Sequence, residues 1–141
     1  MRRRLADGIE LDDDATRIDV DAVHDYLANE SYWAEGRPRE VVERLVREAQ
    51  RVVGLYEGNR QIGFARAFTD GVSLVYLADV YVLSEYRGRG LGIELIRETV
   101  DNGPYGGLRW VLHTRDASGL YRKFGFGGPS PRLMERSRPE N

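Results

Sequence analysis

Residues 78–93 read ADVYVLSEYRGRGLGI, and this stretch decides how the chain folds. Its first half is an apolar segment typical of a buried strand, and its second half is rich in glycine and opens a helical pattern that continues to Val100. Glycines let a backbone approach a bulky anion closely, and the first N–H groups of a helix are unpaired and lie at the positive end of its dipole. The stretch therefore predicts a strand-to-helix turn into which a pyrophosphate fits.

Taken alone, the turn leaves another interpretation open, because its glycines could serve only to shape a tight connection. Two other phosphate-binding motifs fit less well. A Walker loop needs a Lys followed by Ser or Thr, which is absent, and a dinucleotide fingerprint needs a different glycine spacing and a later acid for the ribose.

Length and composition favour one domain that spans residues 1–141. The chain has no cysteine, which excludes structural disulfides, Cys-ligated zinc and a cysteine nucleophile. The net charge is −2 with mixed signs, which argues against a dominant affinity for nucleic acid, and no apolar run is long enough to span a bilayer. We expect a cytoplasmic protein that needs no metal and binds no nucleic acid or membrane. Its ends, about 1–6 and 136–141, are expected to be flexible, with Arg2–Arg4 solvated.

Hydrophobic periodicity predicts the remaining elements. Asp19 is suited to cap a first helix, Pro38 suits the first turn of a second helix that begins at Arg37, and Gly58 with Asn59 is a strong hairpin signal. The apolar run of 74–83 predicts a strand covered on both faces. The expected helices are 19–29, 37–49, 90–100 and 117–123, and the expected strands are 51–57, 61–68, 74–83 and 109–113, with a last extended stretch after 126. This order indicates a mixed α/β sheet.

Two motifs, in order along the chain, resemble those of a known family. Arg87, two residues, Gly90, one residue and Gly92 match the acetyl-CoA signature of the GNAT N-acetyltransferases, and residues 117–126, ASGLYRKFGF, look like the family's second CoA-side motif. The resemblance covers most of the chain. It implies a single-domain α/β fold with a GNAT-like mixed central sheet flanked by helices, and transfer of an acetyl group from acetyl-CoA to a primary amine.

The resemblance also implies how acetyl-CoA is held. Backbone groups of 80–82 pair with the pantetheine arm like an added strand, beside a bulge that splays the sheet. The N–H groups of 88–93 cradle the pyrophosphate, and the Val82 N–H donates to the thioester carbonyl. Arg87 and Arg89 could add charge-assisted contacts. The implied cofactor-binding residues are Val80, Tyr81, Val82, Arg87, Gly88, Arg89, Gly90, Leu91, Gly92 and Ile93.

Tyr121 matches the family position whose hydroxyl protonates the departing CoA thiolate, and a tyrosine is neutral at pH 7 and able to donate a proton. The alternative is a tyrosine that only packs beneath the end of the sheet. Many family members carry Asn seven residues earlier, where this chain has Thr114, so one side-chain contact to CoA is in doubt.

Without a cysteine, direct attack by the amine in a ternary complex is the simplest chemistry, and a base is then needed for the amine proton. Asp79 lies in the apolar strand, where partial burial could adapt it to that role. It could equally be an ion-paired carboxylate of the sheet, with Arg66 or Arg115 as partner, and a water chain could replace a dedicated base.

The acceptor is predicted to lie under the connection between the first two helices, where the resemblance places the acceptor site. Tyr32 and Trp33 are the candidate substrate-binding residues, and a hydrophobic plug is the alternative for both. Asp70 and Glu35 are expected to be solvated acids, although acids near the cleft would favour a cationic acceptor. The acceptor class is a small molecule or peptide that carries a primary amine.

Two further roles stay open. The cofactor cradle could belong to a non-catalytic acyl-CoA-binding sensor or interaction module, against which Tyr121 argues. A homodimer is expected from the resemblance. His24 and His113 lack partner spacing for a metal or a Ser/His/Asp arrangement, so both are expected to be structural.

Overall fold

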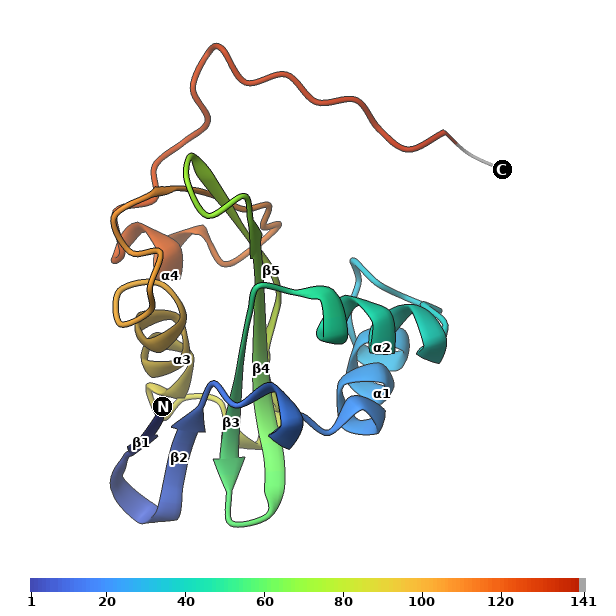
Figure 1. Cartoon of the computed structure of the whole chain (residues 1–141), viewed down its shortest axis with the longest axis vertical. Helices are drawn as coiled ribbons and strands as arrows, with labels where there is room; N and C mark the ends of the chain where they lie inside the picture. The colour runs from blue at the N-terminus through green and yellow to red at the C-terminus, as the bar shows by residue number, and fades with distance from the viewer. Residues whose placement is uncertain (140–141) are drawn as a thin grey trace.

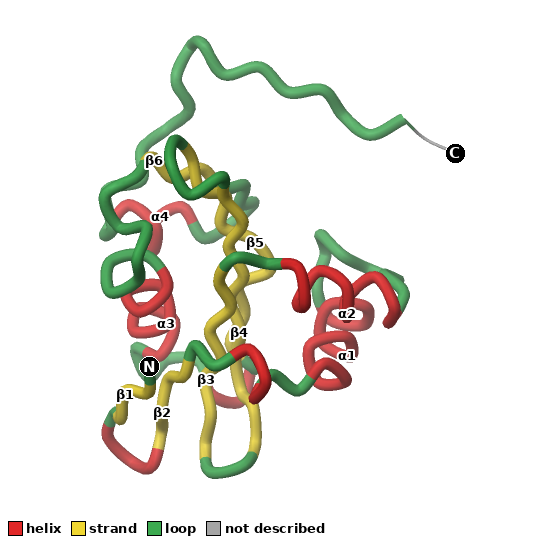
Figure 2. The backbone as a smooth tube through the Cα atoms, in the orientation of Figure 1, coloured by secondary structure: helices red, strands yellow, loops and turns green. Residues whose placement is uncertain are grey.

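The computed structural model describes residues 1–139 and shows one mixed sheet with helices on both faces (Figures 1 and 2). The six strands of the described chain lie in the order β1-β2-β3-β4-β5-β6. Neighbours are antiparallel up to β5, and β5 pairs with β6 in parallel. The strands are β1 Arg2–Arg4, β2 Ile9–Asp12, β3 Arg51–Glu57, β4 Arg60–Thr69, β5 Leu74–Val82 and β6 Arg109–Val111, and the helices are α1 Val20–Glu30, α2 Arg39–Glu48, α3 Leu91–Thr99 and α4 Ser118–Arg122.

Two apolar clusters hold the layers together. One lies under α3 and α4 and includes Leu95, Ile96 and Tyr121, and the other lies under α1 and α2 and includes Leu27 and Val42. In the middle of the sheet, β3 and β4 are buried along most of their length because both faces are covered (Figure 1). The predicted α/β fold with a mixed central sheet is confirmed. No helix within residues 1–139 is long and apolar enough to cross a membrane.

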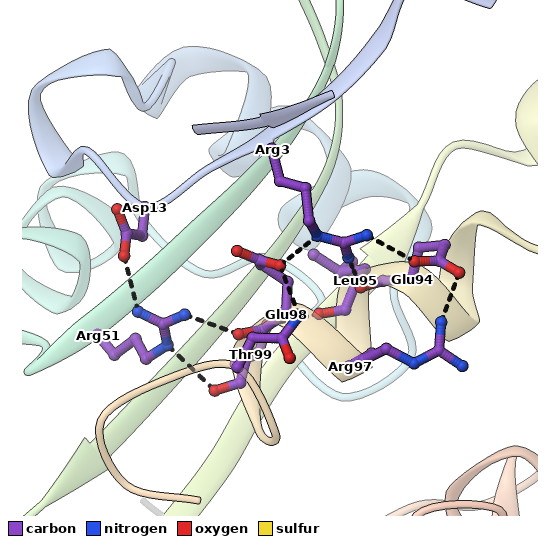
Figure 3. Close-up of polar contacts among 9 residues, drawn as sticks. Arg3, Asp13, Arg51, Glu94, Leu95, Arg97, Glu98 and Thr99 are labelled. Atoms are coloured by element: carbon purple, nitrogen blue, oxygen red, sulfur yellow. Dashed lines mark hydrogen bonds and ion pairs between the residues drawn. The ribbon is translucent and has the colours of Figure 1, made fainter. Parts of the chain in front are cut away.

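The first residues differ from the prediction of a flexible, solvated end. Arg2–Arg4 forms strand β1 and pairs with β2. From this strand Arg3 donates to Glu98 at 2.6 Å and to Glu94 at 3.0 Å, two acids of α3 that lie more than ninety residues further along the chain (Figure 3). The prediction for Arg2–Arg4 was wrong because the partners of this basic strand are distant in sequence. At the other end, 136–139 contains no helix or strand, and residues 140 and 141 lie outside the described residues.

The C-terminal end of α3 is fixed to the sheet by Arg51 of β3. Its guanidinium donates to the backbone carbonyls of Glu98 and Thr99 and to the carboxylate of Asp13 (Figure 3). The last carbonyls of a helix have no partner inside the helix, so these bonds satisfy groups that would otherwise be left unpaired. Arg3 and Arg51 thus hold α3 at a fixed angle behind the glycine-rich turn from which it starts.

The helices begin and end near the predicted capping signals, except that α2 begins two residues later than predicted. The Asp19 side chain accepts from the Ala22 N–H at 3.0 Å and caps α1 as expected. Pro38 is the residue before α2, with extended backbone, so the helix begins at Arg39 and not at Arg37. After α4, residues 127–139 contain no strand.

Strand β5 differs from the prediction of a strand covered on both faces. Its residues alternate between buried and half-buried, because β6 pairs with it only over Leu74–Tyr76 and one face borders a cavity. The pairing with β4 shifts register between Phe64 and Arg66, and Asp79 has a φ of 55° at this shift. A bulge of this kind bends a strand and re-aims its side chains. It lies in the strand for which a bulge was expected, and β5 pairs with β6 only before it, over Leu74–Tyr76.

Candidate functional site

One large open cavity lies between β5, the start of α3, the β6–α4 loop and the α1–α2 connection. The structure brings every sequence-predicted site residue to this cavity except Arg89. Cavity-lining residues that the sequence analysis did not single out for the site include Arg37, Arg66, Phe68, Tyr76 and His113. None of these belongs to a motif, and only the folded sheet shows that they share a wall.

The edge of β5 offers the cavity backbone groups with which no strand pairs. The Leu83 N–H donates to the Ile62 carbonyl of β4 at 2.9 Å. Because successive residues of a strand point their backbone groups to opposite sides, those of Val82 face away from β4. Since β6 pairs only at Leu74–Tyr76, the Val80–Val82 edge has no strand partner on that side. An extended molecule can pair there as an added strand does.

The glycine-rich turn presents a set of amide groups. Gly88 and Gly90 have φ values of 79° and 75°, and a Cβ added to either would meet no atom within 4 Å. No side chain caps α3 at Gly90, and among the described residues the N–H groups of Leu91, Gly92 and Ile93 have no acceptor. Open space in front of unpaired amides at a helix start is the geometry that binds phosphate groups.

The two arginines of the turn point elsewhere. Arg87 donates from Nε to the Val82 carbonyl at 3.1 Å and from Nη2 to the Tyr26 hydroxyl at 2.8 Å. Arg89 lies over the Tyr86 ring, 5.7 Å from its centroid, and outside the cavity lining. In this structure the groups that face the open space at the turn are therefore backbone amides, and Arg87 braces the turn.

Tyr121 combines packing with access to the cavity. Its ring packs edge-on against Phe126 at 5.8 Å, and no described residue forms a hydrogen bond with its hydroxyl. Burial raises the pKa of Tyr121 to about 12, and the hydroxyl carries its proton at neutral pH, as an ordinary tyrosine does. The side chain thus packs in the core and also presents a protonated hydroxyl at the cavity.

Thr114 uses its side chain within the chain. Its Oγ1 accepts from the Ala117 N–H at 3.0 Å, next to the start of α4. Ser and Thr hydroxyls commonly satisfy the unpaired N–H groups at a helix start. This bond gives the threonine a local function at the position where many GNAT proteins carry Asn.

Asp79 is held by three donors from two parts of the fold. Its Oδ1 accepts from Trp33 Nε1 at 2.9 Å, and its Oδ2 accepts from Arg66 Nε at 2.9 Å and from Arg37 Nη1 at 3.1 Å. Of the two predicted ion-pair partners, Arg66 is present, whereas Arg115 pairs with Asp116. Both carboxylate oxygens of this buried residue are therefore engaged by the protein itself.

The aromatic connection between α1 and α2 arches over the cavity. The Tyr32 hydroxyl accepts from the Arg115 N–H at 2.9 Å, and the Arg115 guanidinium lies 3.8 Å from the Tyr32 ring centroid. Tyr32 and Trp33 are 44% and 40% exposed and both line the cavity, so they do not form the alternative hydrophobic plug. The arch connects the α1–α2 side of the site to the β6–α4 side.

Of the other polar candidates, Asp70 belongs to a turn, Glu35 lies outside the cavity and His113 lines it. Asp70 accepts from the N–H groups of Val72 and Ser73, and its hydrogen bonds with Ser73 hold its pKa below the usual range, as in a turn-forming aspartate. Glu35 is exposed and does not line the cavity. His113 does line it, with its ring nitrogens bonded to Tyr76 and, at 2.8 Å, to Glu135.

The family model described as an acetyltransferase (GNAT) domain matches residues 48–127, which include the β5 edge, the glycine turn and Tyr121. The chain belongs to the GNAT acetyltransferase family. An acetyltransferase-designated protein of Gibberella zeae, FG08082, is 30% identical over 133 residues that cover 78% of this chain and 73% of that protein. The expected family and enzyme class are confirmed.

Two further relatives of this GNAT acetyltransferase are one whose name gives only the family and one whose name gives its substrates. A GNAT-family protein of Xanthomonas campestris pv. campestris has a crystal structure that superimposes with a TM-score of 0.86 at 34% identity, covering 93% of this chain and 94% of that one. The L-methionine sulfoximine/L-methionine sulfone acetyltransferase of Pseudomonas paraeruginosa is 28% identical over 117 residues, which cover 78% of this chain and 66% of that protein.

Proposed function

We propose that this GNAT acetyltransferase transfers the acetyl group of acetyl-CoA to a primary amine by direct attack within a ternary complex. The observation that carries the proposal is the meeting, in one cavity, of an unpaired strand edge, a turn of unpaired amides and the Tyr121 hydroxyl. Acetyl-CoA supplies an activated acetyl thioester, and the chain supplies the groups that bind it and move protons.

The residues present fit an acyl-CoA molecule. The backbone of Val80–Val82 suits an extended pantetheine arm with alternating amide groups, and the N–H groups of Leu91, Gly92 and Ile93 suit a pyrophosphate. The open space at Gly88 and Gly90 leaves room for phosphate oxygens close to the backbone.

In the reaction the amine nitrogen forms a bond with the thioester carbonyl carbon and the carbon–sulfur bond breaks. The Val82 N–H is placed to stabilise the carbonyl oxygen as negative charge develops on it. Tyr121, whose hydroxyl is protonated at neutral pH as in an ordinary tyrosine, gives a proton to the leaving sulfur. The absence of cysteine from the chain favours this direct transfer over a route through a cysteine acyl intermediate.

The proton that the amine loses goes to Asp79 or to water. The three donors already on the Asp79 carboxylate favour water as the immediate acceptor, with Asp79 acting on the groups around it. A pH profile of kcat distinguishes the two, because an essential carboxylate base would give it an acidic limb.

The test is calorimetric titration with acetyl-CoA, with ATP as the control, followed by measurement of thiol release with a panel of primary amines. Saturable binding of acetyl-CoA and amine-dependent thiol release support the proposal. Binding without release by any amine would instead favour the sensor or interaction module. A homodimer is part of the proposal and is tested by light scattering.

A further inference from the structure

The acceptor end of the cavity contains a buried arginine with unused donors. The side chain of Arg66 is 10% exposed and its Nε donates to Asp79. No described residue accepts a hydrogen bond from either of its Nη atoms, although Arg66 lines the cavity. A guanidinium has five N–H donors in a planar fork that matches a carboxylate, so the Nη groups that Arg66 turns to the cavity can bind one.

A second guanidinium lies at the same carboxylate. Arg37, whose side chain is 22% exposed, uses Nη1 for Asp79, and no described residue accepts from its Nε or Nη2. One negative charge on Asp79 thus faces two positive charges, which leaves this cluster with an excess of one positive charge. Asp79 fixes both guanidiniums, because its Oδ2 accepts from each of them.

The wider wall of the cavity has the same sign. Arg115, Arg136 and Arg138 line it, against the acids Glu30 and Asp116, and Arg115 pairs with Asp116 at 3.2 Å. The expectation that acids near the cleft would favour a cationic acceptor therefore does not fit the folded site. Its charge favours an acceptor that carries a negative group.

Aromatic rings flank the two arginines. The Phe68 ring centroid lies 5.4 Å from the Arg66 guanidinium, and Phe68 stacks on Tyr76 at 5.0 Å. Trp33, bonded to Asp79, lies on the α1–α2 side. Flat apolar walls beside fixed donors are typical of pockets that hold a small molecule by one polar group and pack against the rest of it.

We propose that the acceptor is a small amino acid, an amine that carries a carboxylate in the same molecule, and that Arg66 and Arg37 bind this carboxylate. Asp79 is then a positioning residue that holds the two guanidiniums. The inference rests on the proposed function and specifies its acceptor. Peptides and polyamines, which lack a carboxylate next to the reacting amine, are poor acceptors on this view.

The experiment compares amino acids with their decarboxylated counterparts. Thiol release is measured with the standard L-amino acids, and with matched pairs such as L-phenylalanine with 2-phenylethylamine and L-methionine with 3-(methylthio)propylamine. β-Alanine and 4-aminobutyrate report the spacing between amine and carboxylate. We expect amino acids to exceed their matched amines in kcat/KM by about 10- to 100-fold, the range for a charge-assisted contact. A kcat/KM for the matched amines equal to or higher than that for the amino acids would overturn the inference.

Variants assign the effect to the two arginines. In R66Q and R37Q the KM for the amino acid should rise about 10-fold or more, whereas the KM for the matched amine should change far less. R66K keeps the positive charge but not the planar guanidinium fork, so it should restore part of the lower KM for the amino acid relative to the matched amine. R44Q, an exposed arginine of α2 paired with Glu48, is the matched control. If R66Q raised the KM for the amino acid and the KM for the matched amine by the same factor, Arg66 would have only a structural role and the inference would be refuted.

Failure of the proposed function is distinguishable from failure of this inference. If no amine produces thiol release, calorimetric titration of the protein with L-phenylalanine and L-methionine, with CoA present, still decides whether the carboxylate site exists. Binding that is lost in R66Q and kept in R44Q supports the site, and absent binding overturns it. Release with 2-phenylethylamine but with no amino acid supports the acetyltransferase reaction and rejects the carboxylate site.

Discussion

Tyr26 of α1 stacks face to face on Tyr81 of β5, with ring centroids 3.9 Å apart and planes 7° apart. The Tyr26 hydroxyl also accepts from Arg87 Nη2 at 2.8 Å. One side chain thus connects the first helix, the strand edge proposed to bind pantetheine and the signature arginine of the turn.

Replacing Tyr26 by Phe should preserve the stack and remove the acceptor of Arg87. We expect the free energy of unfolding to fall by about 1–2 kcal/mol, since the lost bond involves a charged donor, and acetyl-CoA to bind a few-fold more weakly because the turn is less fixed. Urea unfolding and calorimetry measure the two effects. Y105F is the control, as no described residue bonds the Tyr105 hydroxyl, and equal behaviour of the two variants would contradict the bracing role of Tyr26.

Replacing Gly90 by Val should abolish useful acetyl-CoA binding. The φ of 75° at Gly90 is strained for a β-branched residue, and the new side chain would point into the space in front of the amides. We expect binding to weaken by about 100-fold or more. G107V, at an exposed glycine without positive φ, is the matched control, and a folded G90V protein with unchanged affinity would refute the placement of the phosphate site.

Replacing Tyr121 by Phe should lower kcat by about 100-fold or more while leaving the affinity for acetyl-CoA nearly unchanged. The reason is that the hydroxyl has no described protein partner and its loss leaves the ring packing against Phe126 in place. Single-turnover thiol release gives the rate and calorimetry gives the affinity. A Y121F protein with full kcat would show that another group, or water, protonates the leaving sulfur.

Stability should fall in strongly alkaline solution. Burial raises the pKa of Tyr121 from 10.0 to about 12, so between these values the unfolded chain loses the tyrosine proton while the folded chain keeps it. The stabilisation is complete below pH 10.0 and is lost as the pH rises to about 12, with a share for Tyr121 of up to about 3 kcal/mol.

Burial also raises the pKa of Tyr56, Tyr76 and Tyr81, so the decline should be shared among these side chains and Tyr121. Urea unfolding across this pH range, with phenolate absorbance as a second readout, measures it. Y121F should decline less steeply than the unaltered protein, and an identical slope would mean that Tyr121 is not buried in solution.

The substitution Asp79→Asn distinguishes a role of Asp79 as the general base from its role in positioning the two arginines. Asn tolerates the left-handed φ of 55° and still accepts a hydrogen bond, but it carries no charge to hold Arg66 and Arg37. If Asp79 positions the arginines, D79N should raise the KM for the acceptor and keep the acidic limb of the pH–kcat profile. Loss of that limb together with a fall in kcat would identify Asp79 as the base instead.

The local parts of the fold could be predicted from the sequence. The hairpin at Gly58 and Asn59, the Asp19 cap and the strand-to-helix turn each depend on residues within a few positions of one another. The unpaired amides of the turn were equally predictable, since the same glycines that form the turn leave its helix start without a side-chain cap.

The acceptor side could not be predicted in this way. Arg37, Arg66 and Asp79 come from a loop and two strands, and their meeting depends on the sheet register and on the bulge that turns Asp79 inward. Strand β1 escaped prediction for a related reason, because Arg3 finds its acids on α3, ninety-one and ninety-five residues further along the chain. Charge pairs of such long range leave no periodic pattern in the sequence.

Laboratory redesign of the acceptor range is constrained by the bulge. The backbone of Asp79 opens β5 along the edge proposed for the cofactor, while its carboxylate holds the arginines of the opposite end. A replacement there that does not tolerate the left-handed φ would disturb both substrates at once, so selections for new acceptors should leave Asp79 unaltered. Libraries at Phe68 and Tyr76 vary the wall of the cavity without altering the bulge, and are the places where this enzyme can diversify one substrate at a time.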